Sequence, residues 1–193
     1  KDTVTKHSPI LSTIFLSAFD LRRQWTVSGA SITEDEISEI ENLVNSVAIK
    51  MIYKFNDSTF RPIFANLLEW ASTGLPKKDT TGRLLRLRSI YTFTTLFFTH
   101  LKSIVTSYTT YLLPSALSAL ESVDPANPAS RALWSNALHT LTAAAAHDQD
   151  DFFQAPAHFD VLAPALTSQL AHAATLPLFD DLVPALVELA AVA

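Results

Sequence analysis

The amino-acid sequence predicts an all-α fold of HEAT-like helical hairpins, that is, a fragment of an α-solenoid. Hydrophobic residues make up 48% of the 193 residues, whereas only 3 residues are glycine. All-β folds use glycine in their many turns, so this composition disfavours a sandwich or a barrel. Apolar residues recur at helical spacing along most of the chain, and the 10 prolines fit the first turns of helices and the corners between them.

The first helix is predicted over residues 8–24, and the segment "TVSGAS" after it is expected to be a loop. Thr33 is expected to cap a second helix, because Glu36 follows three residues later and completes a capping box. Apolar residues at helical spacing define the expected buried faces of both helices. These residues are Ile10, Leu11, Ile14, Phe15, Ala18 and Phe19 in the first helix and Ile37, Ile40, Val44, Val47 and Met51 in the second.

The stretch "FNDSTFRPIFANLLEW" predicts a third helix with its cap at Ser58 or Thr59. Pro62 then falls in the first turn, where proline removes little backbone hydrogen bonding. Arg61 follows Asp57 by four residues, so the two side chains are expected to form an ion pair. The apolar face of this helix must be covered by neighbouring helices, and it comprises Phe60, Ile63, Phe64, Leu67, Leu68 and Ala71.

The remaining helices follow from apolar runs between proline- and glycine-containing breaks. After the loop "PKKDTTG", a long helix is predicted over residues 83–102. The next segment, "SIVTSYTTYLLPSALSALES", predicts one helix or a kinked pair with its bend at Pro114. The segment "VDPANPAS" then breaks the pattern, so a sub-boundary near 123–128 is expected within a single helical-repeat region, 1–193. Three further helices are expected, at 129–146, 156–174 and 177–193.

The repeat interpretation depends on a pattern of an apolar pair, a proline, a small residue and a leucine. It occurs in "YLLPSALSAL", "VLAPALTSQL" and "DLVPALVELA". The first two prolines are 50 residues apart, close to the length of a HEAT or armadillo unit, but the third follows after only 20. A globular helical bundle is therefore the structural alternative. The chain begins with lysine and stops in an apolar run, so both ends are expected to be cuts in a longer protein.

Charge is distributed unevenly along the chain. Residues 1–102 contain 13 of the 14 Lys+Arg and 10 of the 19 Asp+Glu, whereas residues 103–193 contain Arg131 alone against the other 9 acidic residues. The overall charge of −5 argues against a general nucleic-acid binder but permits a basic patch in the first half. The densest cluster is the candidate contact with RNA or an acidic partner, a solvated helix start being the alternative. It comprises Lys77, Lys78, Arg83, Arg86 and Arg88, of which Arg83 and Arg86 are expected to share a helix face.

Sequence signatures of catalysis are missing. With no cysteine there is no disulfide, no thiolate zinc site and no cysteine nucleophile, and the three glycines stand apart, so no phosphate-binding loop exists. We expect no enzyme activity, no cofactor and no small-molecule substrate. No signal peptide is recognised, and the apolar stretches are too short to span a membrane, so no membrane association is expected.

One cluster has residue types that bind metals, namely His147, Asp148, Asp150, Asp151, His158 and Asp160. A calcium-binding EF-hand loop needs glycine at its sixth position and an acidic residue at its twelfth. Counted from Asp148, those positions hold Phe153 and Phe159. An acidic loop without a metal is therefore expected, and a metal-dependent enzyme built on this cluster is the alternative, which elemental analysis would test.

Three segments carry a family resemblance, namely "MIYKFNDSTFRPIFANLLEWA", "KKDTTGRLLRLRSIYTF" and "LKSIVTSYTTYLLPSALSAL". In this order they resemble the C-terminal region of a family of very large HEAT-repeat proteins. These are the U-three small nucleolar RNA-associated subunits of the UtpA subcomplex in the small-subunit processome, with a BAP twenty-eight-like HEAT protein as the animal counterpart. The resemblance covers residues 10–122, and the alanine-rich remainder carries no family motif.

The resemblance implies a nucleolar scaffold in ribosome biogenesis, without catalysis, that supports pre-rRNA transcription and processing. It implies other UtpA and processome proteins as partners, and pre-rRNA or small nucleolar RNA as further contacts. A HEAT-type transport or regulatory adaptor that binds a protein partner is the alternative function.

Overall fold

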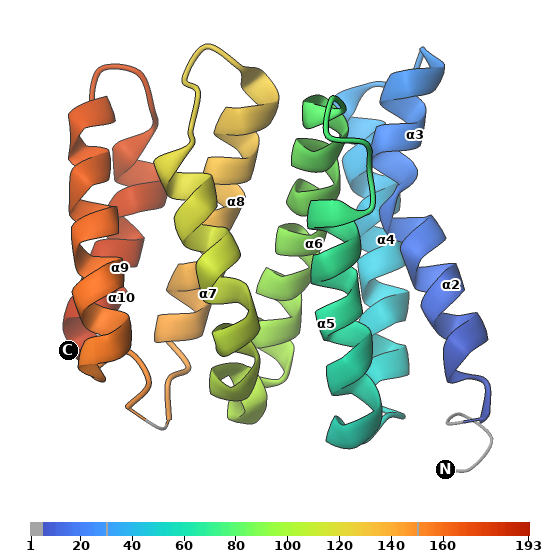
Figure 1. The fold of residues 1–193 in the computed structure, drawn as a ribbon, viewed down its shortest axis with the longest axis horizontal. Coiled ribbons are helices and arrows are strands. Elements are labelled where there is room, and N and C mark those ends of the chain that lie inside the picture. The colour runs from blue at the N-terminus through green and yellow to red at the C-terminus, as the bar shows by residue number, and fades with distance from the viewer. Residues whose placement is uncertain (1–5, 30, 150) are drawn as a thin grey trace. The chain divides into compact units, whose positions relative to one another are not determined.

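The computed structural model describes residues 6–29, 31–149 and 151–193, and these residues form helices and loops without a β-strand (Figure 1). The all-α helical-repeat prediction is therefore confirmed. The chain divides into two compact units, Lys1–Leu96 and Phe97–Ala193, and the division falls inside helix α6. Residues 123–128 connect α7 (Val105–Glu121) and α8 (Pro128–Ala145) within the second unit, and the sub-boundary suggested there stays a prediction.

Within residues 6–29 and 31–96, the first unit contains four complete helices and most of a fifth. They are α2 (Ser8–Phe19), α3 (Leu21–Ser28), α4 (Glu34–Ile52), α5 (Asp57–Thr73) and α6 (Thr80–His100), and α3 continues above α2 in Figure 1. The single helix predicted over 8–24 is thus two helices that meet at Asp20. Helix α3 continues to Ser28 and ends at Gly29, whose φ of 65° lies in the left-handed region that glycine adopts easily. The prediction of a loop was therefore wrong for the part of "TVSGAS" before Gly29.

Helices α4 and α5 begin with side-chain caps. The capping box of α4 is confirmed, since Thr33 Oγ1 accepts a hydrogen bond from the Glu36 amide and the Glu36 carboxylate accepts one from the Thr33 amide. Helix α5 begins earlier than predicted, because Asn56 is its cap and accepts a hydrogen bond from the Thr59 amide at 2.9 Å. Pro62 consequently lies beyond the first turn, where it removes one intrahelical hydrogen bond.

The predicted apolar face of α5 is buried in full. The buried faces of α2 and α4 agree less closely with the predicted ones. In α2, Phe15 and Phe19 are buried as expected, but Ile10 and Ile14 are 60% and 56% exposed. Helical spacing places all of them in one apolar set, but only the aromatic half of that set faces the core.

The buried face of α4 is rotated away from the predicted one. Among the predicted residues only Ile37 is buried, whereas Ile40 and Val47 are exposed. The residues that α4 buries are Ile37, Asn45, Ala48, Ile49 and Ile52. On the opposite side the helix carries a second apolar face, made of Ile40, Leu43 and Val47. The prediction failed because an apolar spacing cannot say which of two apolar faces is turned inward.

In its described residues, 97–149 and 151–193, the second unit contains the rest of α6, four further α-helices and three short helical elements. These elements are η1 (Lys102–Ile104), α7 (Val105–Glu121), α8 (Pro128–Ala145), α9 (Pro156–Ser168), η2 (Gln169–His172), the π-helical η3 (Leu178–Leu182) and α10 (Val183–Val192). Helix α7 runs through Pro114 as one element. The core of the unit is aromatic, with Trp134, Tyr108, Phe97 and Phe98 fully buried.

Candidate functional site

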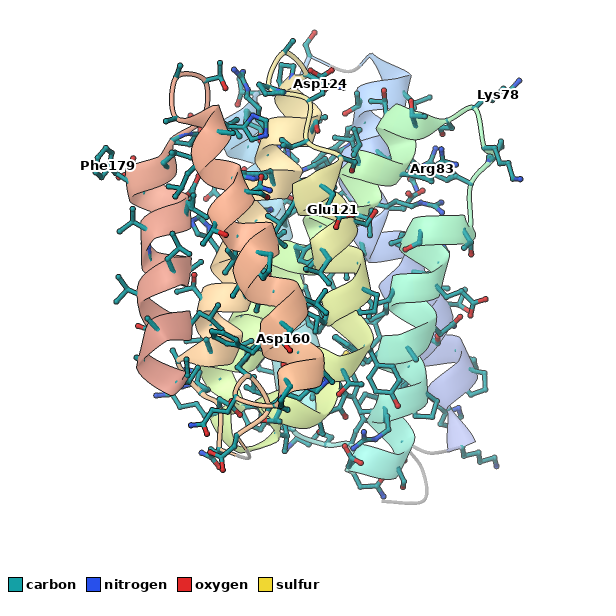
Figure 2. The ribbon with its side chains drawn as sticks, turned by 60° about the vertical axis from the view of Figure 1, so that its left-hand side comes forward. Lys78, Arg83, Glu121, Asp124, Asp160 and Phe179 are labelled. Carbon is teal, nitrogen blue, oxygen red and sulfur yellow. The ribbon has the colours of Figure 1, made fainter. Side chains whose placement is uncertain are left out.

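The basic cluster predicted from the sequence begins in the loop between α5 and α6. Lys77 and Lys78 are exposed there, and Figure 2 shows the Lys78 side chain pointing away from the helices. Arg83, in the first turns of α6, donates hydrogen bonds from Nη2 to the Lys77 carbonyl at 2.7 Å and from Nη1 to the Pro76 carbonyl at 3.3 Å. Arg83 therefore holds the loop against the start of α6, and the two lysines lie on the loop that it orders.

Arg86 does not lie on the surface with them. Its side chain is buried, and its Nε donates to Asp20 Oδ1 at 2.7 Å. Its Nη1 lies 3.3 Å from the Gly74 carbonyl oxygen, and the guanidinium carbon lies 4.0 Å from the centre of the Trp70 ring. The charge is thus neutralised by a carboxylate and stacked on an aromatic face, which makes Arg86 part of the core of the first unit.

Arg88 also forms an ion pair within the first unit. Its Nη2 donates to Glu34 Oε1 at 2.6 Å, and the same carboxylate oxygen accepts from Arg22 Nη1 at 2.7 Å. Arg22 also binds Glu41, at 2.6 Å, and the Ser89 hydroxyl donates to Glu41 at 2.8 Å. A shared carboxylate therefore links α3, α4 and α6.

These ion pairs form two charged groups in the first unit. The first comprises Asp20, Arg23 and Arg86, and the second comprises Arg22, Glu34, Glu41 and Arg88, in which Glu34 is exposed. Burial alone raises the pKa of Asp20, but the hydrogen bonds from Arg23, Arg86 and Gln24 outweigh it and lower that pKa to about 2. Burial likewise opposes the charge of Glu34, yet its hydrogen bonds to Arg22 and Arg88 lower its pKa.

Neither charged group was predicted from the sequence. Arg86 and Asp20 are separated by 66 positions and Arg88 and Glu34 by 54, and no local spacing rule relates such distant residues. One local signal existed, namely Asp20 directly after a run of apolar residues, where an acidic side chain needs a buried partner. The structure thus brings together Lys77, Lys78 and Arg83 and places Arg86 and Arg88 in internal ion pairs. RNA binding by the surface residues stays a prediction.

The acidic loop before α9 is organised around backbone groups. Asp148 accepts hydrogen bonds from the amides of Phe152 and Phe153 at 3.3 and 3.0 Å, and from Thr106 of α7 at 3.3 Å. The His158 ring stacks on Phe152, with 3.7 Å between the ring centres. Asp150 lies outside the described residues. Among the residues that the structure does describe, no three His, Asp or Glu side chains are grouped so that they could hold a metal ion.

Within the described ranges, no helix combines the length and the apolar character needed to cross a membrane. Fold and site together define a protein of the helical-repeat class, in which two of the five candidate cations, Arg86 and Arg88, join neighbouring helices. The chain belongs to the BP28CT (NUC211) domain family, whose model matches residues 3–153.

Proteins with the name U3 small nucleolar RNA-associated protein 10 match the chain over its whole length. The protein from Chaetomium globosum is 52% identical over 196 residues, that from Neurospora crassa 47% over 194, and that from Aspergillus oryzae 46% over 200. Each match covers 100% of this chain but only 11% of the relative. The resemblance to the C-terminal region of this family is confirmed, and it extends beyond the residues from which it was predicted.

Proposed function

We propose that the chain is a non-catalytic scaffold segment that acts in ribosome biogenesis, in the nucleolus and as part of the small-subunit processome. The relatives support this setting, because their name states an association with the U3 small nucleolar RNA and their similarity extends over the whole chain. The proposed partners are other UtpA and processome proteins, together with pre-rRNA or small nucleolar RNA. Through these contacts the segment supports pre-rRNA transcription and processing.

The observation that carries the scaffold role is the second apolar face of α2 and α4. Ala18 of α2 and Val44 of α4 line the same small cavity, and the two helices run antiparallel (Figure 1). Ile14, one turn before Ala18, therefore lies on the side of α2 nearest Val47, so that the two exposed faces adjoin. We name this surface the α2–α4 face, and it comprises Ile10, Ile14, Ile40, Leu43 and Val47.

An aliphatic surface of this kind is typical of a unit within a helical-repeat array. Each unit buries one face within itself and another against its neighbour, because no unit has a complete core alone. Exposed aliphatic patches that span two helices are uncommon in proteins that act as single globular domains. The α2–α4 face is accordingly proposed to contact a further helical repeat, which gives the segment a fixed position in a longer scaffold.

The proposed RNA contact is the loop that contains Lys77 and Lys78. Their ammonium groups are exposed, and the hydrogen bonds from Arg83 to the loop carbonyls hold the loop in place. Lysines on an ordered loop bind phosphates without a large loss of backbone entropy. Arg86 is left out of this contact because it is buried.

The scaffold role can be tested by exchanging a segment of a relative for this chain. This chain would replace the aligned segment of the Neurospora crassa relative, either unchanged or with Leu43→Asp and Val47→Asp together. Val27→Asp is the matched control, because Val27 is 72% exposed on α3. We expect U3 small nucleolar RNA to co-purify with the unchanged and control proteins and to fall several-fold with the double substitution. Equal recovery from all three, or none from the unchanged chimera, would contradict the proposal.

The RNA contact needs a separate test. Lys77→Glu with Lys78→Glu is compared with Lys50→Glu and Lys54→Glu, which reverse two exposed lysines on another loop and helix. If the loop binds phosphates, the first pair weakens binding to single-stranded pre-rRNA and lowers the slope of log affinity against log salt by about 1.4, whereas the second pair leaves both unchanged. An unchanged slope in both variants would remove the RNA contact and leave the scaffold role standing.

A further inference from the structure

The outward side of the last helix carries a surface that the proposed function does not use. Phe179 of η3 is 86% exposed, and Figure 2 shows its ring pointing away from the helices. Val183 and Val187 follow at intervals of four residues and are 37% and 59% exposed. The three side chains therefore form an apolar line along η3 and α10.

The inward side of the same helix explains why this line cannot turn into the core. Leu178 and Leu182 are buried, and Asp181 beside them is also buried. The Asp181 carboxylate accepts a hydrogen bond from the Ser135 hydroxyl and lies 2.8 Å from His139 Nε2, both on α8. Anchored in this way, η3 must direct Phe179 outward. The exposure of the ring is thus set by the fold rather than by a frayed end.

Two acidic residues flank the apolar line, about 100° further around the helix. Asp180 and Glu188 each follow an apolar position by one residue, with Pro184 between them at the same spacing. Asp180 is exposed and Glu188 half-buried. We name the surface the Phe179 face, and it comprises Phe179, Val183, Val187, Asp180 and Glu188.

The net negative charge of the second unit favours a partner with basic side chains. Residues 97–193 contain two basic residues, Lys102 and Arg131, against nine acidic ones. A phosphate backbone or an anionic membrane would be repelled from such a surface. Two copies of the chain packed through this face would bring Asp180 and Glu188 of each copy into one interface, where like charges cost free energy.

We propose that the Phe179 face binds an amphipathic helix of a protein partner, whose apolar side covers Phe179, Val183 and Val187 and whose flank carries lysine or arginine. The binding mode is that of a helix packed on a helix, with anchors repeated every three to four residues. The aromatic ring at one end supplies the main anchor, and the two carboxylates set the direction and the charge of the partner. This inference goes beyond the scaffold proposal and does not depend on it.

The test uses two labelled synthetic helices of about 18 residues with the same leucine face, one flanked by lysine and arginine and the other by glutamate. Binding to the 193-residue chain is measured by fluorescence anisotropy. We expect the basic helix to bind at least about tenfold more tightly than the acidic one. Equal affinity for the two helices would overturn the proposal.

Variants locate the binding. Phe179→Ser with Val187→Ser should weaken the basic helix about tenfold, and Asp180→Lys with Glu188→Lys should reverse the preference toward the acidic helix. Val27→Ser and Asp160→Lys are the matched controls, since each changes an exposed residue outside the face, and they should alter affinity less than about twofold.

Two outcomes would contradict the inference. One is unchanged affinity in both test variants, which would mean that the basic helix binds the acidic unit without using this face. The other is a dimer of the unmodified chain by sedimentation that Phe179→Ser converts to a monomer, which would make a second copy the occupant. Circular dichroism of each variant checks that the helices are retained.

Discussion

Asp20 and Arg86 form a buried ion pair, with 2.7 Å between Asp20 Oδ1 and Arg86 Nε, although 66 positions separate them in the sequence. Arg23 binds the same carboxylate, and Arg86 also stacks on Trp70 of α5. The pair therefore joins the junction of α2 and α3 to α5 and α6. Several helices of the first unit are positioned by one carboxylate.

Loss of the Asp20 carboxylate should destabilise the chain strongly. In Asp20→Ala the Arg86 charge stays buried without its partner, which costs about 3–5 kcal/mol of the free energy of unfolding. The exposed pair of Asp57 and Arg61, with 2.8 Å between Asp57 Oδ2 and Arg61 Nη2, confirms a sequence prediction and provides the control. Asp57→Ala should cost less than about 1 kcal/mol. Urea unfolding measures both, and similar losses would show that the buried pair has no special role.

The same carboxylate makes stability depend on pH. The pKa of Asp20 is lowered from 3.8 to about 2 in the folded chain, so the folded state binds this proton more weakly than the unfolded state. The stabilisation, on the order of 2 kcal/mol, is complete above about pH 5 and is lost as the pH falls from 4 to 2. Unfolding by urea at a series of pH values should show this loss. The slope should be smaller in Asp20→Asn, and an identical pH profile in that variant would contradict the assignment.

The structure and the sequence prediction differ in the residue that caps α5. Asn56 caps the helix, with 2.9 Å between its Oδ1 and the Thr59 amide nitrogen, whereas Ser58 donates its hydroxyl to Asn56. Asn56→Ala should therefore cost about 1 kcal/mol of unfolding free energy, and Ser58→Ala less than half of that. Thermal unfolding ranks the two variants. A larger loss for Ser58→Ala would favour the cap predicted from the sequence.

In the second unit, Trp134 and Gln169 form a buried hydrogen bond between α8 and η2. The indole Nε1 donates to Gln169 Oε1 at 2.9 Å, and both side chains are buried. Gln169→Ala leaves the indole donor without a partner, so it should cost about 1–3 kcal/mol and change the near-ultraviolet circular dichroism of tryptophan. Gln154→Ala, at an exposed glutamine of the same unit, is the control and should change neither signal.

Local chemistry made much of the fold predictable. The capping box at Thr33, the apolar face of α5 and the break at "VDPANPAS" each depend on residues close in sequence, and the structure contains all three. The inward face of α4 could not be predicted in the same way. Val47 and Ile49 are equally apolar, and only the packing of α4 within the folded unit decides that Ile49 is buried and Val47 exposed.

For the candidate site, the sequence predicts surface exposure only for residues whose exposure does not depend on how the helices pack. Lys77 and Lys78 lie in a polar loop, and such residues stay in solvent whatever the fold. Arg86 is of the same charge and in the same cluster, yet it is buried because Asp20 is brought to it by the packing of separate helices. The spacing of charges along one helix does not indicate whether an oppositely charged residue on another helix will pair with them.

The central claim is that the α2–α4 face is covered within a longer helical-repeat scaffold. Hydrogen exchange of the α4 amides tests it most directly, measured in the 193-residue chain alone and in the chimeric Neurospora crassa protein, with the α8 amides as internal reference. The account predicts that α4 exchanges at least about tenfold more slowly in the longer protein while α8 changes little. Equal exchange of α4 in both proteins would show that the face stays exposed and would contradict the claim.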